Sequence, residues 1–476
     1  MSFKPIRNKL RKYTFDSLVD PILKILRDQE SSNNKYAFWH SLLLLRWTLE
    51  FSGQAIKTKD ASYQDVAKLL TKVSDLEKNH ETFDFKKNGW FGKTFIILSH
   101  QQFKYQETAF WDSFARQNIL FNELEHKHNI RKSFEDKTGI SISIFLELTR
   151  FFWIYLFHGD KANLKFYGTI PENLISSLKK EFSKSIFDKY VDLLSISRES
   201  ISSFLENDTR LIRNYDLQVF ETSIFTRKPF LLYNNKIHIP HKDLFNQTCN
   251  HFIYDYLKNR DPVFPEELGN RMEKYIQKGL DEISLKSLNG KEIKSLFGLN
   301  DKSPDFLVND NIIIEAKAIE VKPYVGINPT DDILGNEFKK NLVKAYTQQM
   351  LTLTRKLKVE KCWGIIITYK NLYLGNSADI WDQFLKKEFE KLNISNEKLP
   401  IDHLFIMDLQ TWDKTMQVVK SNGISLERIL EKVKHADAES QSRKFSFHMH
   451  LEEYEIQNYN LTYLNSAKKL NIKKSF

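Results

Sequence analysis

The segment from Ser303 to Lys317 constrains the fold more than any other part of the chain. Two strongly apolar runs stand on either side of a short polar stretch, Asn309-Asp310-Asn311. Apolar runs separated by a few residues that favour turns predict an antiparallel β-hairpin. Asn and Asp tolerate the left-handed backbone conformation that a tight turn requires, so the polar stretch fits the tip of this hairpin.

The pairing register of the hairpin decides which side chains meet. A three-residue turn sets Asp305 opposite Glu315, whereas a two-residue turn sets Asp305 opposite Ile314 and on the other face of the sheet. Because side chains alternate along a strand, Lys317 shares a face with Glu315. With the three-residue turn, two carboxylates and one ammonium group therefore come together on one face.

The first part of the chain, from about residue 13 to residue 210, has apolar residues at the three and four spacing of helices. The longest apolar runs, residues 37–51 and 142–157, contain charged residues and are too short to cross a bilayer. We therefore predict that both runs are buried helices, and we expect no membrane association. Residues 229–240 instead predict two short strands, which places a domain boundary near residue 224.

The second part of the chain alternates helices and strands. The sequence predicts helix 242–258, helix 265–282, the hairpin, a loop at 321–335, helix 336–357, strand 362–368, strand 403–409 and helix 425–433. This order predicts an α+β or α/β layer architecture with a mixed central sheet flanked by helices. The predicted organisation is a helical region at residues 1–224, a sheet-containing domain at 225–435, and an extension at 436–476 with a strand-like segment at 445–451.

Composition and charge set weaker limits on function. The formal net charge is +10, which suits a nucleic-acid partner but also an ordinary basic protein. Cys249 and Cys362 are the two cysteines, so a disulfide framework and a thiolate zinc site are not expected. The beginning of the sequence shows no secretory signal, and a reducing, cytoplasmic setting is expected.

The order of the polar residues resembles the signature of the PD-(D/E)xK phosphodiesterase superfamily, the restriction-endonuclease-like nucleases. Pro304-Asp305 is followed, after nine residues, by Glu315-Ala316-Lys317. Glu273, on the helix before the hairpin, matches a glutamate that such nucleases hold near the active site. Tyr346 and Gln349 match a Tyr-x-x-Gln pattern on a second core helix, and helical spacing turns Gln349 toward the sheet. The resemblance covers about residues 260–410.

The resemblance implies a set of roles for these residues. Asp305 and Glu315 would each offer a carboxylate oxygen to Mg²⁺ or Mn²⁺, and the backbone carbonyl of Ala316 would complete the protein ligands. Lys317 would orient or help to deprotonate the attacking water, and Glu273 would be an auxiliary metal ligand. A second helix would bring Gln349 to the same site.

The expected function is Mg²⁺-dependent hydrolysis of DNA phosphodiester bonds. A helical region in front of such a nuclease resembles effectors of bacterial anti-phage defence, in which residues 1–224 would sense a trigger, bind a partner protein or form an oligomer. Two alternatives stay open at this point. One is an RNase of the same fold, and the other is a non-catalytic module that binds nucleic acid or assembles with partners.

Overall fold

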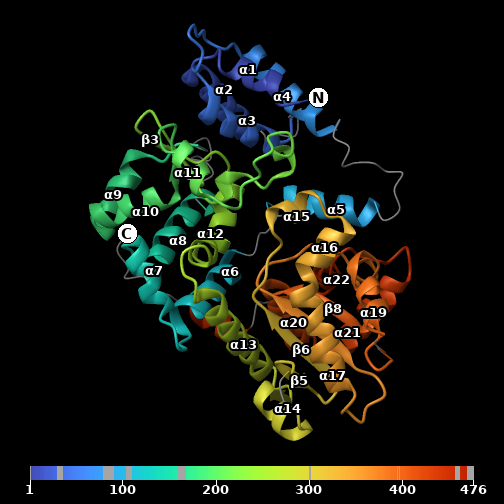
Figure 1. Cartoon of the computed structure of the whole chain (residues 1–476). Helices are drawn as coiled ribbons and strands as arrows, with labels where there is room; N and C mark the ends of the chain where they lie inside the picture. Colours follow the sequence, from blue (N-terminus) through green and yellow to red (C-terminus); the bar gives the residue numbers. More distant parts are fainter. Residues whose placement is uncertain are drawn as a thin grey trace. The chain divides into compact units, whose positions relative to one another are not determined.

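The chain forms two compact units in a computed structural model, and each unit is described by itself (Figure 1). The model describes residues 2–28, 36–78, 90–102, 105, 110–158, 168–299, 302–393, 395, 397–455 and 461–468. The first unit contains residues 1–86, 97–110 and 130–260. The second unit contains residues 87–96, 111–129 and 261–476.

The first unit is mainly helical and carries a small mixed sheet. Its helices are α1 (Lys4–Leu10), α2 (Phe15–Asp28), α3 (Phe38–Phe51), α4 (Tyr63–Lys78), α7 (Ile130–Thr138), α8 (Ile142–His158), α9 (Glu172–Phe182), α10 (Lys184–Leu194), α11 (Ile201–Asn207) and α12 (Lys242–Lys258). The strands β1 (Ser195–Ile196), β2 (Phe230–Tyr233) and β3 (Lys236–His238) pair in that order, the first pair parallel and the second antiparallel. Asn234 and Asn235 form the turn between β2 and β3 at φ 49° and 56°.

The predicted long apolar helices are confirmed as α3 and α8, and both are packed into the first unit. In α3 even the charged Arg46 is buried, because two carboxylates surround it. Among the described residues, no single helix has the length and apolar character needed to cross a membrane, although α7 and α8 taken together as a bent pair pass that test.

The second unit is built on a five-stranded mixed sheet of order β4-β5-β6-β7-β8. The strands are β4 (Ser287–Asn289), β5 (Phe306–Val308), β6 (Ile312–Lys317), β7 (Trp363–Thr368) and β8 (Leu404–Asp408). The pairs β4-β5 and β5-β6 are antiparallel, and the pairs β6-β7 and β7-β8 are parallel. The mixed α/β architecture that the sequence predicted is therefore present, with helices flanking the strands.

Helices surround this sheet in the second unit. They include α13 (Phe264–Glu282), α14 (Gly290–Phe297), α15 (Pro323–Ile327), α16 (Asp331–Phe338), the π-helical turns η7 (Lys339–Val343) and η8 (Ala345–Met350), α17 (Leu351–Thr354), α18 (Ser377–Ile380), α19 (Lys386–Leu392), α20 (Leu409–Asn422), α21 (Leu426–Ala438), α22 (Phe447–His450) and α23 (Thr462–Lys468). The helical segment from α16 to α17 shares one apolar core with β6 and β7, to which Leu342 and Tyr346 contribute beside Ile313 and Ile366. Side chains alternate along a strand, so Ile313 and Glu315 lie on the same face of β6. The helical segment that packs on Ile313 therefore lies over the face that carries Glu315.

Two predicted segments differ from the structure. The stretch 321–335 is not a loop, because α15 begins at Pro323 and the side chain of Thr330 caps α16 by accepting a hydrogen bond from the Ile333 N–H. The strand predicted at 445–451 is instead α22 followed by a 3₁₀ turn, with Phe447 and Leu451 buried at helical spacing. In both cases, burial of apolar residues on one helical side decided the conformation.

The division between the units also differs from the predicted boundary near residue 224. The β2-β3 hairpin and α12 belong to the first unit, because β2 pairs with β1 and α12 packs against α8. The structure thus divides the chain after residue 260, and residues 111–129 join the second unit from far upstream. The predicted extension after residue 435 is part of the second unit as well.

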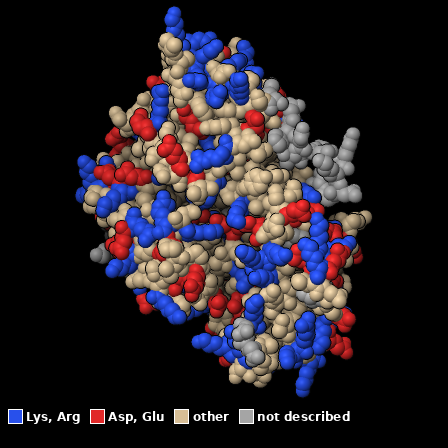
Figure 2. Space-filling view, viewed as in Figure 1, with Lys and Arg blue, Asp and Glu red and all other residues tan. Residues whose placement is uncertain are grey.

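The surface charge does not form one field on the face shown in Figure 2, where basic and acidic side chains are interspersed over both units. Basic side chains gather over α1, where Lys4, Lys9, Arg11 and Lys12 are exposed. On this face the basic side chains therefore form several small patches.

Candidate active site

The β5-β6 hairpin has the three-residue turn that the sequence predicted. Val308 pairs with Ile312 and Phe306 pairs with Ile314, so Asp305 continues the same register opposite Glu315. Asn309 and Asp310 have φ values of 47° and 65°, the left-handed conformation expected for this turn. The predicted register is therefore confirmed, and it brings the polar residues of the hairpin together.

The polar groups on this hairpin contact one another. The N–H of Ala316 donates a 2.7 Å hydrogen bond to Oδ2 of Asp305, which ties the carboxylate to the neighbouring strand. Nζ of Lys317 donates to Oε1 of Glu315. The side chain of Glu315 is only 1% exposed and that of Lys317 is 24% exposed, so the ammonium group lies nearer to solvent than its partner.

Burial raises the pKa values of three carboxyl groups at this site, and the charge of Asp305 adds to two of these shifts. Burial is the main cause of the raised pKa of Asp305. Burial, followed by the charge of Asp305, raises the pKa of Glu315 to about 8. The same two causes raise the pKa of Glu273 to about 7, which shows that α13 brings its carboxyl group close to Asp305. Negative charge is therefore poorly compensated here, although Lys317 opposes part of each shift.

The second helix also contributes to the site, as the sequence predicted. The side chain of Gln349 interacts with the Glu315 carboxylate and favours its charged form. Gln348 turns away and accepts from Nζ of Lys302. The ring of Tyr346 is buried, and its hydroxyl donates a 2.6 Å hydrogen bond to the carbonyl of Leu399. Tyr346 therefore holds the helix in place and does not line the site.

The residues present fit a hard divalent cation. Oε2 of Glu315 is buried and has no hydrogen-bond partner among the described residues. A buried, unpartnered carboxylate oxygen is costly unless a cation lies against it. Carboxylate and carbonyl oxygens are the donors that Mg²⁺ prefers. Among the described residues, no group of three or more His, Cys, Asp and Glu side chains forms a metal-ligand cluster, so Glu273 is linked to the site by charge alone.

Two features of the site had no signal in the sequence. One is the hydrogen bond from Ala316 to Asp305, which depends on the exact register of the hairpin. The other is the pair of π-helical turns, η7 and η8, in the segment that carries Gln349. Such turns are rare and frequently occur at functional sites. Their wider winding shifts the direction of every side chain that follows them.

Comparisons with protein-family models, with characterised proteins and with solved structures found no match for this chain. The functional argument therefore depends on the geometry and chemistry of the site.

Proposed function

We propose that this protein is a metal-dependent nuclease that hydrolyses the phosphodiester bonds of DNA. The observation that carries the proposal is the convergence of Asp305, Glu315 and Lys317 on one hairpin, with a buried carboxylate oxygen that has no hydrogen-bond partner in the part of the chain that the structure describes. A structural ion pair needs only one carboxylate for each ammonium group, whereas three carboxyl groups interact with Lys317 here. The need for additional positive charge is what supports a divalent cation at this position.

The metal would be held by Asp305, Glu315 and the backbone carbonyl of Ala316. The N–H of Ala316 points toward Asp305, and within an extended strand the carbonyl of the same residue points to the same strand edge. When bound, Mg²⁺ or Mn²⁺ would supply charge neutralisation at the phosphate and would lower the pKa of a coordinated water. Glu273 would add negative charge from α13 and act as an auxiliary ligand.

The remaining site residues would act on the water and the phosphate. Lys317 is the more exposed partner of its ion pair, so its ammonium group is placed to orient the attacking water and to face the phosphate charge. Gln349 would hold the Glu315 carboxylate in the orientation that leaves Oε2 directed at the metal. In this assignment Lys317 is a catalytic residue and Gln349 is a positioning residue.

The arrangement of the elements supports the restriction-endonuclease-like fold that the resemblance implies. A glutamate-bearing helix, an Asp-bearing strand, a tight turn, a Glu-Ala-Lys strand and a glutamine-bearing helix follow one another along the second unit. The charge of Asp305 acts on both Glu273 and Glu315, and the side chain of Gln349 interacts with Glu315, which supports the proposal. The first unit would then sense a trigger, bind a partner or form an oligomer, as in effectors of bacterial anti-phage defence.

The direct test is cleavage of supercoiled plasmid by the full chain in Mg²⁺ and in EDTA. We expect nicking in Mg²⁺ only, and a loss of about 10²-fold or more in Asp305→Asn and in Lys317→Gln. The same hairpin offers matched controls, Asp310→Asn and Lys286→Gln, because Asp310 and Lys286 form an exposed ion pair away from the site. Both control variants should cleave at the rate of the unchanged protein.

The outcomes separate the competing functions. Plasmid binding without cleavage in Mg²⁺ or Mn²⁺ would favour the non-catalytic module. Cleavage of tRNA with an intact plasmid would make the enzyme an RNase. Equal rates for Asp305→Asn and for the unchanged protein would refute the assignment of the site.

A further inference from the structure

The first unit contains a large polar cavity that the proposed nuclease chemistry does not use. Its volume is about 960 Å³, and it is lined by the ends of α7 and α12, by α10 and α11, and by the segments around residues 208 and 227. Sites for small ligands commonly occupy about 300–1,000 Å³. The cavity is therefore large enough for a ligand of nucleotide size.

The lining carries more positive than negative charge. Six cationic side chains line the cavity, from Lys137, Lys189, Arg210, Arg227, Lys228 and Arg260, against three carboxylates, from Asp192, Asp208 and Asp255. Serine and threonine hydroxyls complete the wall, including those of Ser200, Ser203 and Thr209. Hydroxyl groups and guanidinium groups together are the donors that recognise phosphate oxygens.

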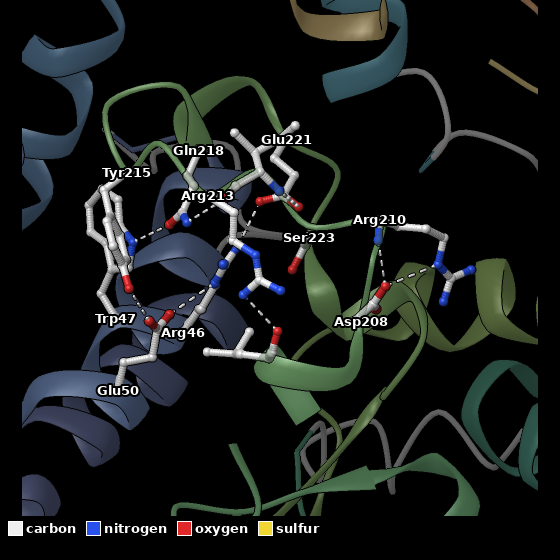
Figure 3. Close-up of polar contacts among 12 residues, drawn as sticks. Arg46, Trp47, Glu50, Asp208, Arg210, Arg213, Tyr215, Gln218, Glu221 and Ser223 are labelled. Atoms are coloured by element: carbon white, nitrogen blue, oxygen red, sulfur yellow. Dashed lines mark hydrogen bonds and ion pairs between the residues drawn. The ribbon is translucent and has the colours of Figure 1, made fainter. Parts of the chain in front are cut away.

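The arginine groups crowd one end of this cavity. Arg210 and Arg227 share one carboxylate, that of Asp208, at 3.3 Å and 2.8 Å (Figure 3 shows Arg210 with Asp208). Nε of Arg227 is buried and has no hydrogen-bond partner among the described residues. Burial and the nearby charge of Arg210 lower the pKa of Arg227. Arg210 also contacts the carboxylate of Asp255, at 3.8 Å, so two carboxylates face the two guanidinium groups at this end of the cavity.

A second pair of cations lies in the same wall. Nζ of Lys228 donates to the carbonyls of Asp192 and Leu193 at 3.1 Å and 2.9 Å, at the end of α10. Burial, followed by the charge of Arg260, lowers the pKa of Lys228 to about 8. The guanidinium of Arg260 lies over the ring of Tyr256 at 4.2 Å, which orients this exposed side chain. An anion in the cavity would relieve the repulsion within both pairs.

We propose that this cavity binds a small phosphate-bearing ligand, with Arg227 and Arg260 as the principal contacts to its phosphate groups. The volume of the cavity suits a compact ligand such as a nucleotide. The first unit would then be the part of the chain that responds to a small molecule. The proposal does not depend on the nuclease activity of the second unit.

The test measures binding of ATP and of inorganic pyrophosphate to the full chain by isothermal titration calorimetry. EDTA is present throughout, so that the acidic site of the second unit holds no metal and repels anions. We expect saturable binding of at least one probe. Arg227→Gln and Arg260→Gln should each weaken it by about tenfold or more, as expected when a charged hydrogen bond is lost. Arg131→Gln is the control, because Arg131 is exposed on α7 and does not line the cavity.

Each outcome decides the proposal. Arg227 is buried beside Asp208, so the melting temperature of its variant is compared first, and the exposed Arg260 gives an independent variant if the first is unfolded. No saturable binding of either probe overturns the proposal, as does equal affinity in Arg260→Gln and Arg131→Gln. Displacement of ATP by a short DNA oligonucleotide at these residues would assign the cavity to nucleic acid and overturn the small-ligand proposal.

Discussion

Each unit buries a cluster of carboxylates, and the two clusters differ in how many of their carboxylate oxygens accept a hydrogen bond from the protein. In the first unit, Arg46 donates to Glu50 at 3.0 Å and to Glu221 at 2.6 Å (Figure 3). The remaining two carboxylate oxygens accept from the Tyr215 hydroxyl and from the N–H of Ile212, at 3.0 Å and 3.1 Å. Every oxygen of this cluster therefore has a protein donor, whereas Oε2 of Glu315 in the second unit has none among the residues that the structure describes.

This difference is the one expected between a structural cluster and the site that we propose. A buried carboxylate whose lone pairs are filled by the protein stabilises one arrangement of the chain. Asp413 gives a second example within the unit that contains the candidate site, because it accepts from Arg116, Tyr275 and Tyr463. Burial still raises the pKa of Asp413, to about 6. A raised pKa alone is therefore not the mark of a functional site, and the missing donor is more informative.

The largest effect on stability is expected at the satisfied cluster. Arg46→Met removes the cation that pairs with both Glu50 and Glu221, which leaves two buried carboxylates without its compensation. We expect a loss of about 3–5 kcal/mol in the free energy of unfolding, measured with urea. Arg213→Met is the control, because Arg213 is exposed and donates only to backbone carbonyls. Equal losses in both variants would contradict the structural role of the cluster.

At the carboxylate cluster around Glu315, we do not expect a substitution to lower the free energy of unfolding. Glu315→Gln keeps the shape of the side chain but removes a carboxyl group whose ionisation is opposed by burial and by the charge of Asp305. In EDTA we expect this variant to be as stable as the unchanged protein or more stable by about 1–2 kcal/mol, while its cleavage of plasmid is lost. A loss of several kcal/mol in EDTA would mean that Glu315 serves the fold and not a metal.

The cluster around Glu315 should also make the stability of the protein depend on pH. The folded protein holds protons on Glu273 and Glu315 up to pKa values of about 7 and about 8, whereas the unfolded chain releases them near pH 4.5. The folded state therefore binds more protons between these values, and stability in EDTA should fall as the pH rises from about 5 to about 8. Urea midpoints at pH 6.5 and pH 8 test this, because Asp413 has already titrated. An unchanged slope in Glu273→Gln would contradict the assignment.

The smallest effect on stability is expected from a variant that leaves one carboxylate oxygen of the Arg46 cluster without its hydrogen-bond donor. Tyr215→Phe removes the donor to Oε2 of Glu50 and changes little else, since the ring stays stacked on Phe3. We expect a loss of about 1 kcal/mol in the free energy of unfolding. Mg²⁺ should not restore it, because Arg46 still neutralises Glu50. Recovery with Mg²⁺ would show that any unpartnered carboxylate in this protein attracts the metal.

Local signals in the sequence predicted most of the hairpin and its helices. Asn309 and Asp310 identified the three-residue turn, and that turn fixed which face carries Asp305 and Glu315. The helix 242–258 was predicted with its exact bounds. Helical spacing also turned Gln349 toward Glu315. These features depend on neighbours along the chain, so turn chemistry and periodicity were sufficient.

Features that depend on distant partners were not predictable in this way. The β2-β3 hairpin belongs to the first unit because β2 pairs with β1. No local sequence pattern predicts this pairing. The stretch 321–335 contains Pro323 and Gly335, which suggested a loop, yet its apolar residues pack into the core of the second unit. The cavity cations Arg210, Arg227 and Arg260 are separated in the sequence and form no motif.

The discontinuity of the second unit has a consequence for how this protein is made and dissected. Arg116 emerges from the ribosome long before Asp413, its hydrogen-bond partner 297 residues later, so this unit is completed only when nearly the whole chain has been synthesised. A fragment beginning at residue 261 would lack Arg116, so the buried carboxylate of Asp413 would lose this cationic partner. The unit that carries the candidate site can therefore be excised intact only if residues 111–129 are supplied with it, as a separate peptide or a fused segment.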